Sequence, residues 1–121
     1  MLVVFADNQV LTAPNGTSVT VTTDPVALGE NHVMTAVTNV HDIFGVTPGQ
    51  PGLGWYTEVS MDGQTWVAQG IADGPITSVG ASRRGAGDVY GVYVRVVVTF
   101  TCDTGTIGSA TFDLHATFKS V

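Results

Sequence analysis

Two segments near the end of the chain decide the fold: Tyr90–Phe100 (YGVYVRVVVTF) and Ser109–Lys119 (SATFDLHATFK). Both alternate with a period of two residues, and their even-numbered positions form an apolar face. This pattern is typical of β-strands that bury one side. Residues 101–108 contain Asp103 and Gly105, which predicts a hairpin loop between the two strands. We therefore expect an antiparallel ribbon with its even-numbered face in a core.

The rest of the chain carries further strand and turn signals. Pro14-Asn15-Gly16 and Asp62-Gly63 predict tight turns, and Asp7-Asn8 predicts a kink. We expect further strands at 2–5, extended by 10–12, and at 17–23, 32–40, 55–60, 65–69 and 75–79, and loops at 26–31, 41–54 and 80–88. This spacing predicts an all-β chain of about eight strands, a single-domain antiparallel β-sandwich over residues 1–121 of jelly-roll or immunoglobulin-like type.

The composition limits the kinds of partner. The chain of 121 residues is long enough to bury a core, but only 12% of its residues are charged and its net charge is −6. Lys119 is the only lysine, so we expect no binding to nucleic acid or to anionic membranes, both of which need clustered positive charge. The single cysteine, Cys102, rules out an intramolecular disulfide and a cysteine-rich zinc site.

The first residues bear on localisation. Met1–Asp7 lacks a basic start, and its apolar run is too short for a signal peptide. No stretch approaches the ~20 apolar residues of a membrane-spanning helix. We therefore expect the protein in the cytoplasm or in a virion.

Three sequence patterns could carry catalysis. Asp103-Thr104-Gly105 matches the triplet of aspartic proteases, but a turn in a hairpin loop explains it better because that chemistry needs two facing carboxylates. A triad could combine Asp42 with one of the serines at 60, 82 and 109 and a histidine at 32 or 41, although no nucleophile-elbow motif supports it. We expect no enzyme activity.

Asp113 and His115 form the third pattern. They lie two residues apart on one predicted strand and therefore share its outward face. Such a pair can hold a metal or orient a general base, and His32 or His41 would have to come near by folding to add a ligand. A polar solvent face is the simpler interpretation, and we expect no metal and no cofactor.

Two further features could bind a partner. Arg83-Arg84 lies between glycines and could be either a solvated loop tip or a basic loop that grips an acidic patch on another copy. Trp55, Tyr56 and Trp66 flank a turn and could stack on a sugar. Alternation favours Trp55 inward and Tyr56 outward, and core packing explains these rings better than a glycan platform.

The segment Glu58–Trp66 (EVSMDGQTW) resembles the "EVSxDGxxW" hairpin of several β-sandwich modules, and Tyr93–Val96 (YVRV) is similar to a strand that often follows it. The modules are accessory or structural proteins of phage-like particles, discoidin-like carbohydrate-binding domains and fibronectin-like domains. The resemblance covers about a third of the chain and implies the sandwich architecture. It implies no binding residue.

Low charge and the lack of a catalytic cluster favour a non-enzymatic assembly protein, such as a capsid-decorating or other virion subunit. We expect a closed oligomer, such as a trimer, formed through loops 45–54 and 80–88 and the chain ends, together with a larger protein shell. The outward face of the ribbon, where residues 93, 95 and 97 are expected beside 113, 115 and 117, is the first place to look for a partner. The candidate interface residues are Phe44, Pro48, Pro51, Leu53, Arg83, Arg84, Tyr93, Arg95 and His115. The alternative is a carbohydrate-binding module that uses Trp55, Tyr56 or Trp66.

Overall fold

The computed structural model describes residues 1–120, and the described residues form nine β-strands. The strands are β1 (Leu2–Pro14), β2 (Ser18–Thr22), β3 (Val26–Ala27), β4 (Val33–Phe44), β5 (Gly52–Ser60), β6 (Val67–Ile76), β7 (Gly80–Asp88), β8 (Tyr93–Thr101) and β9 (Ile107–Lys119). Among these residues there is no helix of the length and hydropathy that crossing a membrane requires.

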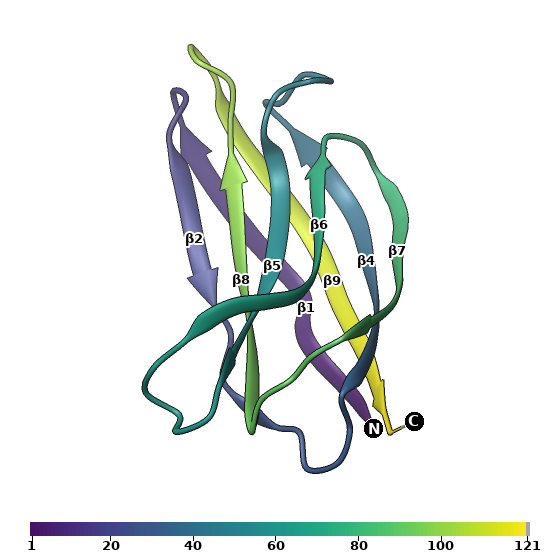
Figure 1. The fold of residues 1–121 in the computed structure, drawn as a ribbon. Coiled ribbons are helices and arrows are strands. Elements are labelled where there is room, and N and C mark those ends of the chain that lie inside the picture. Colours follow the sequence, from purple (N-terminus) through teal and green to yellow (C-terminus); the bar gives the residue numbers. More distant parts are fainter. Residues whose placement is uncertain (121) are drawn as a thin grey trace.

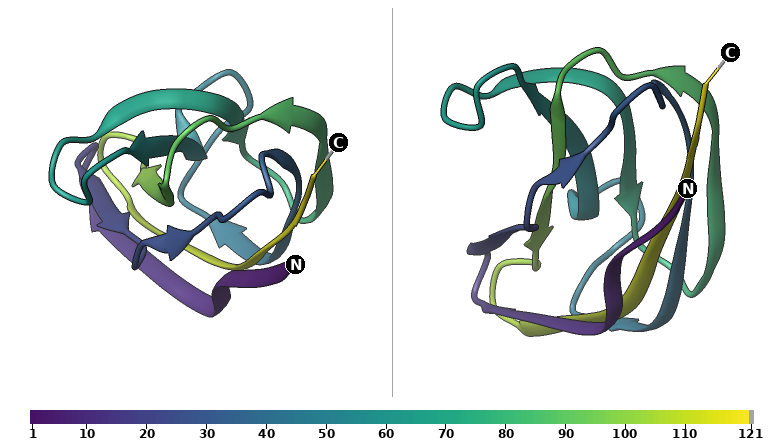
Figure 2. Two further views of the ribbon diagram at one scale, coloured as in Figure 1. Left: turned by 60° about the horizontal axis from the view of Figure 1, so that its bottom comes forward. Right: turned by 90° about the horizontal axis from the view of Figure 1, so that it is seen from below.

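The strands form two sheets that pack face to face (Figure 1). One sheet has the order β1-β9-β4-β7, and we call it sheet A. The other has the order β2-β8-β5-β6, with the short β3 paired to β8, and we call it sheet B. The start of β1 and the end of β9 lie side by side (Figures 1 and 2), joined by the N-terminal amine of Met1, which donates to the carbonyl oxygen of Phe118 at 2.8 Å. The predicted antiparallel β-sandwich is confirmed.

The pairing of the strands is nested. Apart from β3, the first strand pairs with the last (β1–β9), the second with the second-last (β2–β8), then β4 with β7 and β5 with β6, all antiparallel. The chain is thus one long ribbon whose tip is the β5–β6 turn, rolled up so that its successive strand pairs alternate between the sheets. The sequence left two topologies open, jelly-roll and immunoglobulin-like. This arrangement is the jelly roll.

The predicted hairpin between the two alternating segments is wrong. β8 belongs to sheet B and β9 to sheet A, so residues 102–106 form an arch that crosses from one sheet to the other. The two strands face each other across the core instead of pairing. Their outward faces therefore point in opposite directions, and Tyr93 and Arg95 do not lie beside Asp113 and His115.

The core forms between the inward faces of the sheets, largely as the alternation predicts. Val94, Val96, Val98 and Phe100 of β8 are buried, as are all five apolar positions of β9 from Ala110 to Phe118. The even-numbered pattern fails before β8 begins, where Tyr90 and Val92 are 57% and 42% exposed. On the other face, Val97 is buried although alternation places it outward.

Four predicted segments also differ from the structure. Residues 80–88, expected to be a loop, form β7 at the edge of sheet A next to β4. The strand expected at 75–79 is instead the end of β6, which stops at Ile76. β4 continues to Phe44 and β5 begins at Gly52, so the loop expected at 41–54 is reduced to residues 45–51. Within the loop expected at 26–31, Val26–Ala27 forms β3.

A buried polar network ties the two sheets together. The indole Nε1 of Trp55 in sheet B donates to the Thr38 hydroxyl in sheet A at 2.7 Å. Thr38 donates in turn to Asp73 at 3.4 Å, and Asp73 also accepts from Ser82 at 2.7 Å. Arg84 of β7 forms an ion pair with Asp73 of β6 at 2.9 Å. This network closes the β6–β7 side of the sandwich with polar contacts.

Candidate functional site

The outer face of sheet A holds a group of titratable side chains whose ligand atoms lie close together. In the register of the sheet, Val4 of β1, His115 of β9, Val37 of β4 and Arg83 of β7 form one row across four strands. Asp113 lies two residues before His115 on β9, so it points to the same side. The sequence already placed Asp113 and His115 on the outward face of β9. These two residues therefore lie at the centre of this surface.

Folding adds two residues to that pair. The imidazole Nε2 of His41 lies 2.7 Å from Oδ2 of Asp113. A carboxylate oxygen of Asp7 lies within 4.8 Å of ligand atoms of both Asp113 and His115. We call Asp7, His41, Asp113 and His115 the β9 cluster. The sequence offered His32 or His41 as a further ligand. Folding brings His41 beside Asp113, and it also brings Asp7, which the sequence did not suggest, close to both residues of the pair.

An irregularity in β1 puts Asp7 in this place. The pairing of β1 with β9 shifts register between Val4 and Gln9, and Asn8 has a left-handed φ of 48°. The extra residues bulge out of the strand, as the predicted kink at Asp7-Asn8 anticipates. The same bulge turns the Asn8 backbone N–H toward Asp113, to which it donates at 2.7 Å.

These contacts keep Asp113 ionised. The Asn8 N–H, followed by the imidazole of His41, lowers the pKa of Asp113 below its usual value because both stabilise the carboxylate. The Asp113 side chain is 19% exposed and that of His41 is 39% exposed, so the group is accessible from solvent. The cluster can bind a cation or orient an imidazole.

The catalytic arrangements considered from the sequence are not assembled. Among residues 1–120, no hydroxyl or thiol is hydrogen-bonded to His41. His32 instead contacts the carbonyl oxygen of Glu30 and stacks on Tyr90. The Ser82 hydroxyl donates to Asp73, and the Ser60 hydroxyl donates to Asp62.

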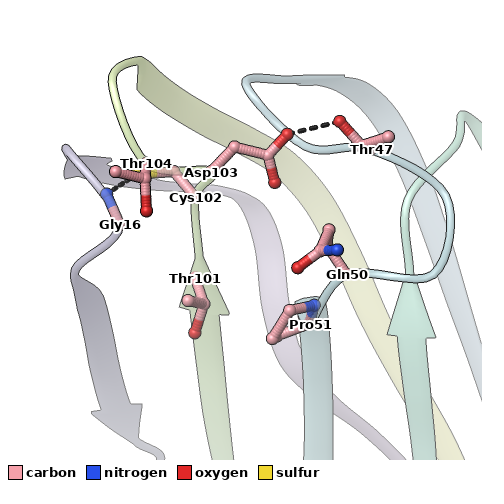
Figure 3. A pocket seen from close by; sticks show the side chains of 8 residues that line it. All are labelled: Gly16, Thr47, Gln50, Pro51, Thr101, Cys102, Asp103 and Thr104. Atoms are coloured by element: carbon pink, nitrogen blue, oxygen red, sulfur yellow. Dashed lines mark hydrogen bonds between the residues drawn. The ribbon is translucent and has the colours of Figure 1, made fainter.

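Asp103 lines a different feature, an open cleft of about 460 Å³ where the β1–β2 turn, loop 45–51 and the β8–β9 arch meet (Figure 3). Its carboxylate accepts a hydrogen bond from the Thr47 hydroxyl. Beside it, the Cys102 sulfur accepts from the Gly16 backbone N–H at 3.2 Å. These contacts tie three connections together. Asp103 therefore makes structural contacts within the β8–β9 arch, in line with the turn role that the sequence favoured over a protease triplet.

The residues predicted to form an interface do not share one surface. Phe44, Pro48 and Pro51 are exposed at the cleft end, whereas Leu53 is fully buried in the core. Tyr93 and Arg95 lie on β8 in sheet B, where Arg95 pairs with Glu58 at 2.8 Å. Arg83 and His115 lie on the outer face of sheet A, as does Phe44 at the end of β4, which pairs with the outward-facing Ser109. Arg84 points the other way, into the ion pair with Asp73.

The three aromatic residues do not form an exposed platform. Trp55 is 3% exposed and its indole N–H is bonded to Thr38, as its predicted inward position requires. The Arg95 guanidinium covers the half-buried Trp66, with its carbon 4.1 Å from the ring centroid. Tyr56 is exposed at 41%, as predicted from alternation.

Searches against family models, curated proteins and solved structures found no match to this chain.

Proposed function

We propose that this protein is a non-enzymatic assembly subunit that binds copies of itself through the outer face of sheet A. We further propose that it serves in a larger protein particle such as a virion, either in the shell or as a decoration on it. The observation that carries the proposal is the apolar surface around His115. Leu2 and Val4 of β1 are 67% and 52% exposed there, and Val37 of β4, on the other side of β9, is 39% exposed.

This apolar surface is slightly hollow. Leu2 and Val4 are two residues apart on β1 and pair with Thr117 and His115 of β9. A shallow depression of about 350 Å³ runs between Leu2, Val37 and His115. Exposed apolar groups that touch one another mark a binding surface more strongly than isolated ones do. A partner that fills the depression would remove Leu2 and Val37 from water.

The size of the sheet fits a stable interface. Strands lie about 4.8 Å apart and rise about 3.3 Å per residue, so the 47 residues of β1, β4, β7 and β9 cover roughly 740 Å². A standard interface buries about 800 Å² per partner. The outer face of sheet A is therefore large enough to support association without any other part of the surface.

Charge on this face favours a second copy as the partner. Arg83 is exposed at one edge and forms no ion pair within residues 1–120. Asp7 and Asp42 are exposed on β1 and β4 of the same sheet. When two copies of one face meet about a twofold axis, each contributes both signs of charge, so Arg83 of one copy can meet a carboxylate of the other.

The particle assignment rests on composition and on analogy. Charged residues make up 12% of the chain, about half the share usual in soluble domains, which suits a surface covered by neighbours. Jelly rolls occur in viral capsid proteins and also in lectins. Because a fold does not determine a function, this analogy supports the proposal only together with the apolar face.

The test is the native mass as a function of concentration. Sedimentation velocity should show a species heavier than the 12.6 kDa chain at micromolar concentration, and Val37→Asp should shift it to the monomer. Val67→Asp is the matched control, because Val67 is an exposed valine on β6 of sheet B.

Two results would refute self-association through this face. One is a wild-type monomer up to near-millimolar concentration. The other is an oligomer that persists in Val37→Asp but dissociates in Val67→Asp. Electron microscopy of the purified oligomer with the particles of its source would then test the virion assignment separately.

A further inference from the structure

We propose that the β9 cluster binds one divalent transition-metal ion of the zinc class, with Asp7, Asp113 and His115 as ligands and His41 as the residue that holds Asp113 in place. This proposal does not rest on self-association, because all four side chains belong to one chain. It assigns a ligand to the group of residues that lies at the centre of the outer face of sheet A.

The geometry brings three ligand atoms to one point from two strands. One imidazole nitrogen of His115 and one carboxylate oxygen each from Asp7 and Asp113 lie within 4.8 Å of one another. Ligand atoms about 2.0–2.2 Å from a zinc ion are about 3.3–3.5 Å apart in a tetrahedral site. The side chains therefore need to move by only about an ångström, and the exposed Asp7 on its bulge has room to do so.

Asp113 is already oriented. Its Oδ1 accepts from the Asn8 N–H, and its Oδ2 lies 2.7 Å from His41 Nε2. Each carboxylate oxygen has a second lone pair that remains available to a metal. Hydrogen bonds from outer residues to a metal-binding carboxylate commonly fix its position and raise affinity. The contacts of Asp113 are of this kind.

The local charge also favours a cation. Two carboxylates come within 4.8 Å of each other, and within residues 1–120 neither forms an ion pair with lysine or arginine. Within the described residues, the ion pair of Asp113 is with His41, when that imidazole is protonated. A divalent ion would neutralise both carboxylates, and the overall charge of −6 adds a weaker attraction.

The donor set selects the metal. An imidazole nitrogen combined with two carboxylate oxygens suits Zn²⁺, Ni²⁺ or Co²⁺, whereas Mg²⁺ and Ca²⁺ prefer oxygen ligands alone. Three protein ligands leave at least one coordination position for water. We therefore expect binding of Zn²⁺ with a stoichiometry of one per chain and much weaker binding of Mg²⁺.

Isothermal titration of chelator-treated protein with zinc chloride tests this directly. His115→Ala and Asp7→Asn should each weaken zinc binding by about tenfold or more, and His41→Gln should weaken it by about 10- to 100-fold through Asp113. His32→Gln is the matched control, because His32 lies outside the cluster, and it should bind zinc like the wild type. Circular dichroism confirms that each variant is folded.

A second readout locates the ion. In NMR spectra, zinc should shift the imidazole signals of His115 and leave those of His32 unchanged. The proposal is overturned if the wild type binds no stoichiometric zinc, or if His115→Ala binds it as tightly as the wild type. Repeating the titration at a protein concentration at which sedimentation shows the monomer separates metal binding from self-association, since a monomer that still binds zinc retains this site.

Discussion

Replacing Thr38 by valine should destabilise the protein far more than the loss of one oxygen atom suggests. Thr38 is fully buried on β4, and its hydroxyl is the acceptor for the Trp55 indole N–H from the opposite sheet. It also donates to Asp73. Valine has almost the same shape, so packing is preserved and the change isolates the two hydrogen bonds.

The magnitude follows from what each partner loses. A buried donor without an acceptor costs about 1–3 kcal/mol, and the Trp55 N–H would be such a donor. Asp73 keeps its contacts with Ser82, Arg84 and the Gly74 backbone N–H, so losing Thr38 costs it only about 0.5–1.5 kcal/mol. Together we expect Thr38→Val to lower the free energy of unfolding by roughly 2–4 kcal/mol.

Urea unfolding followed by tryptophan fluorescence measures this loss. The midpoint should fall with an unchanged slope, because the surface exposed on unfolding stays the same. Thr20→Val is the control, since the exposed Thr20 makes the same type of hydroxyl contact on the surface of β2 and should change stability by less than about 0.5 kcal/mol. In a Trp55→Phe background, Thr38→Val should cost clearly less, because no indole donor remains. A wild-type midpoint for Thr38→Val, or an equal cost in both backgrounds, would refute the reasoning.

Two further predictions concern the core and the β5–β6 turn. Phe112→Ala should lower the free energy of unfolding by about 3–5 kcal/mol in the same urea assay, because Phe112 is fully buried and alanine leaves a cavity. NMR titration should show a pKa of about 2 for Asp62, whose carboxylate accepts from the backbone N–H groups of Thr65 and Gln64 and from the Ser60 hydroxyl. Because this pKa lies below the unfolded value, the Asp62 contribution to stability is present above about pH 4 and is lost as the pH falls toward 2.

The sequence predicted the buried faces well but not the neighbours of each strand. Alternation in β8 and β9 reports which side of a strand meets a core, and this is the same whether two strands pair or face each other across the sandwich. Residues such as Asp103 and Gly105 serve an arch as well as a hairpin. The length of 101–108 was a usable signal, because hairpin loops most often have two to five residues.

β7 shows how a partner strand can outweigh local preference. Its sequence, GASRRGAGD, contains glycines at 80, 85 and 87 and lacks apolar alternation, so it predicts a loop. As an edge strand it needs only the hydrogen bonds of β4 on one side. The half-exposed Arg84 side chain can then reach Asp73 of β6 and neutralise it, and sequence alone contains no indication of that pairing.

The β9 cluster was predictable only in part. The spacing of Asp113 and His115 fixed their common face, and the kink at Asp7-Asn8 was visible as a break in the strand pattern. That the kink lies beside Asp113 depends on the pairing of β1 with β9, which joins residues more than a hundred positions apart in the chain. His41 depends in the same way on the pairing of β4 with β9.

The nested pairing also sets the order in which the protein can form during synthesis. β9 lies between β1 and β4, so these two strands cannot join into sheet A until β9 has left the ribosome. Until then β1 and β4 present unpaired edges, and the hydrophobic side chains of both sheets lack their cover. Only the β5–β6 ribbon can pair early with neighbours in sequence. Such long-range closure predicts slow folding and a nascent chain that depends on chaperones to avoid aggregation.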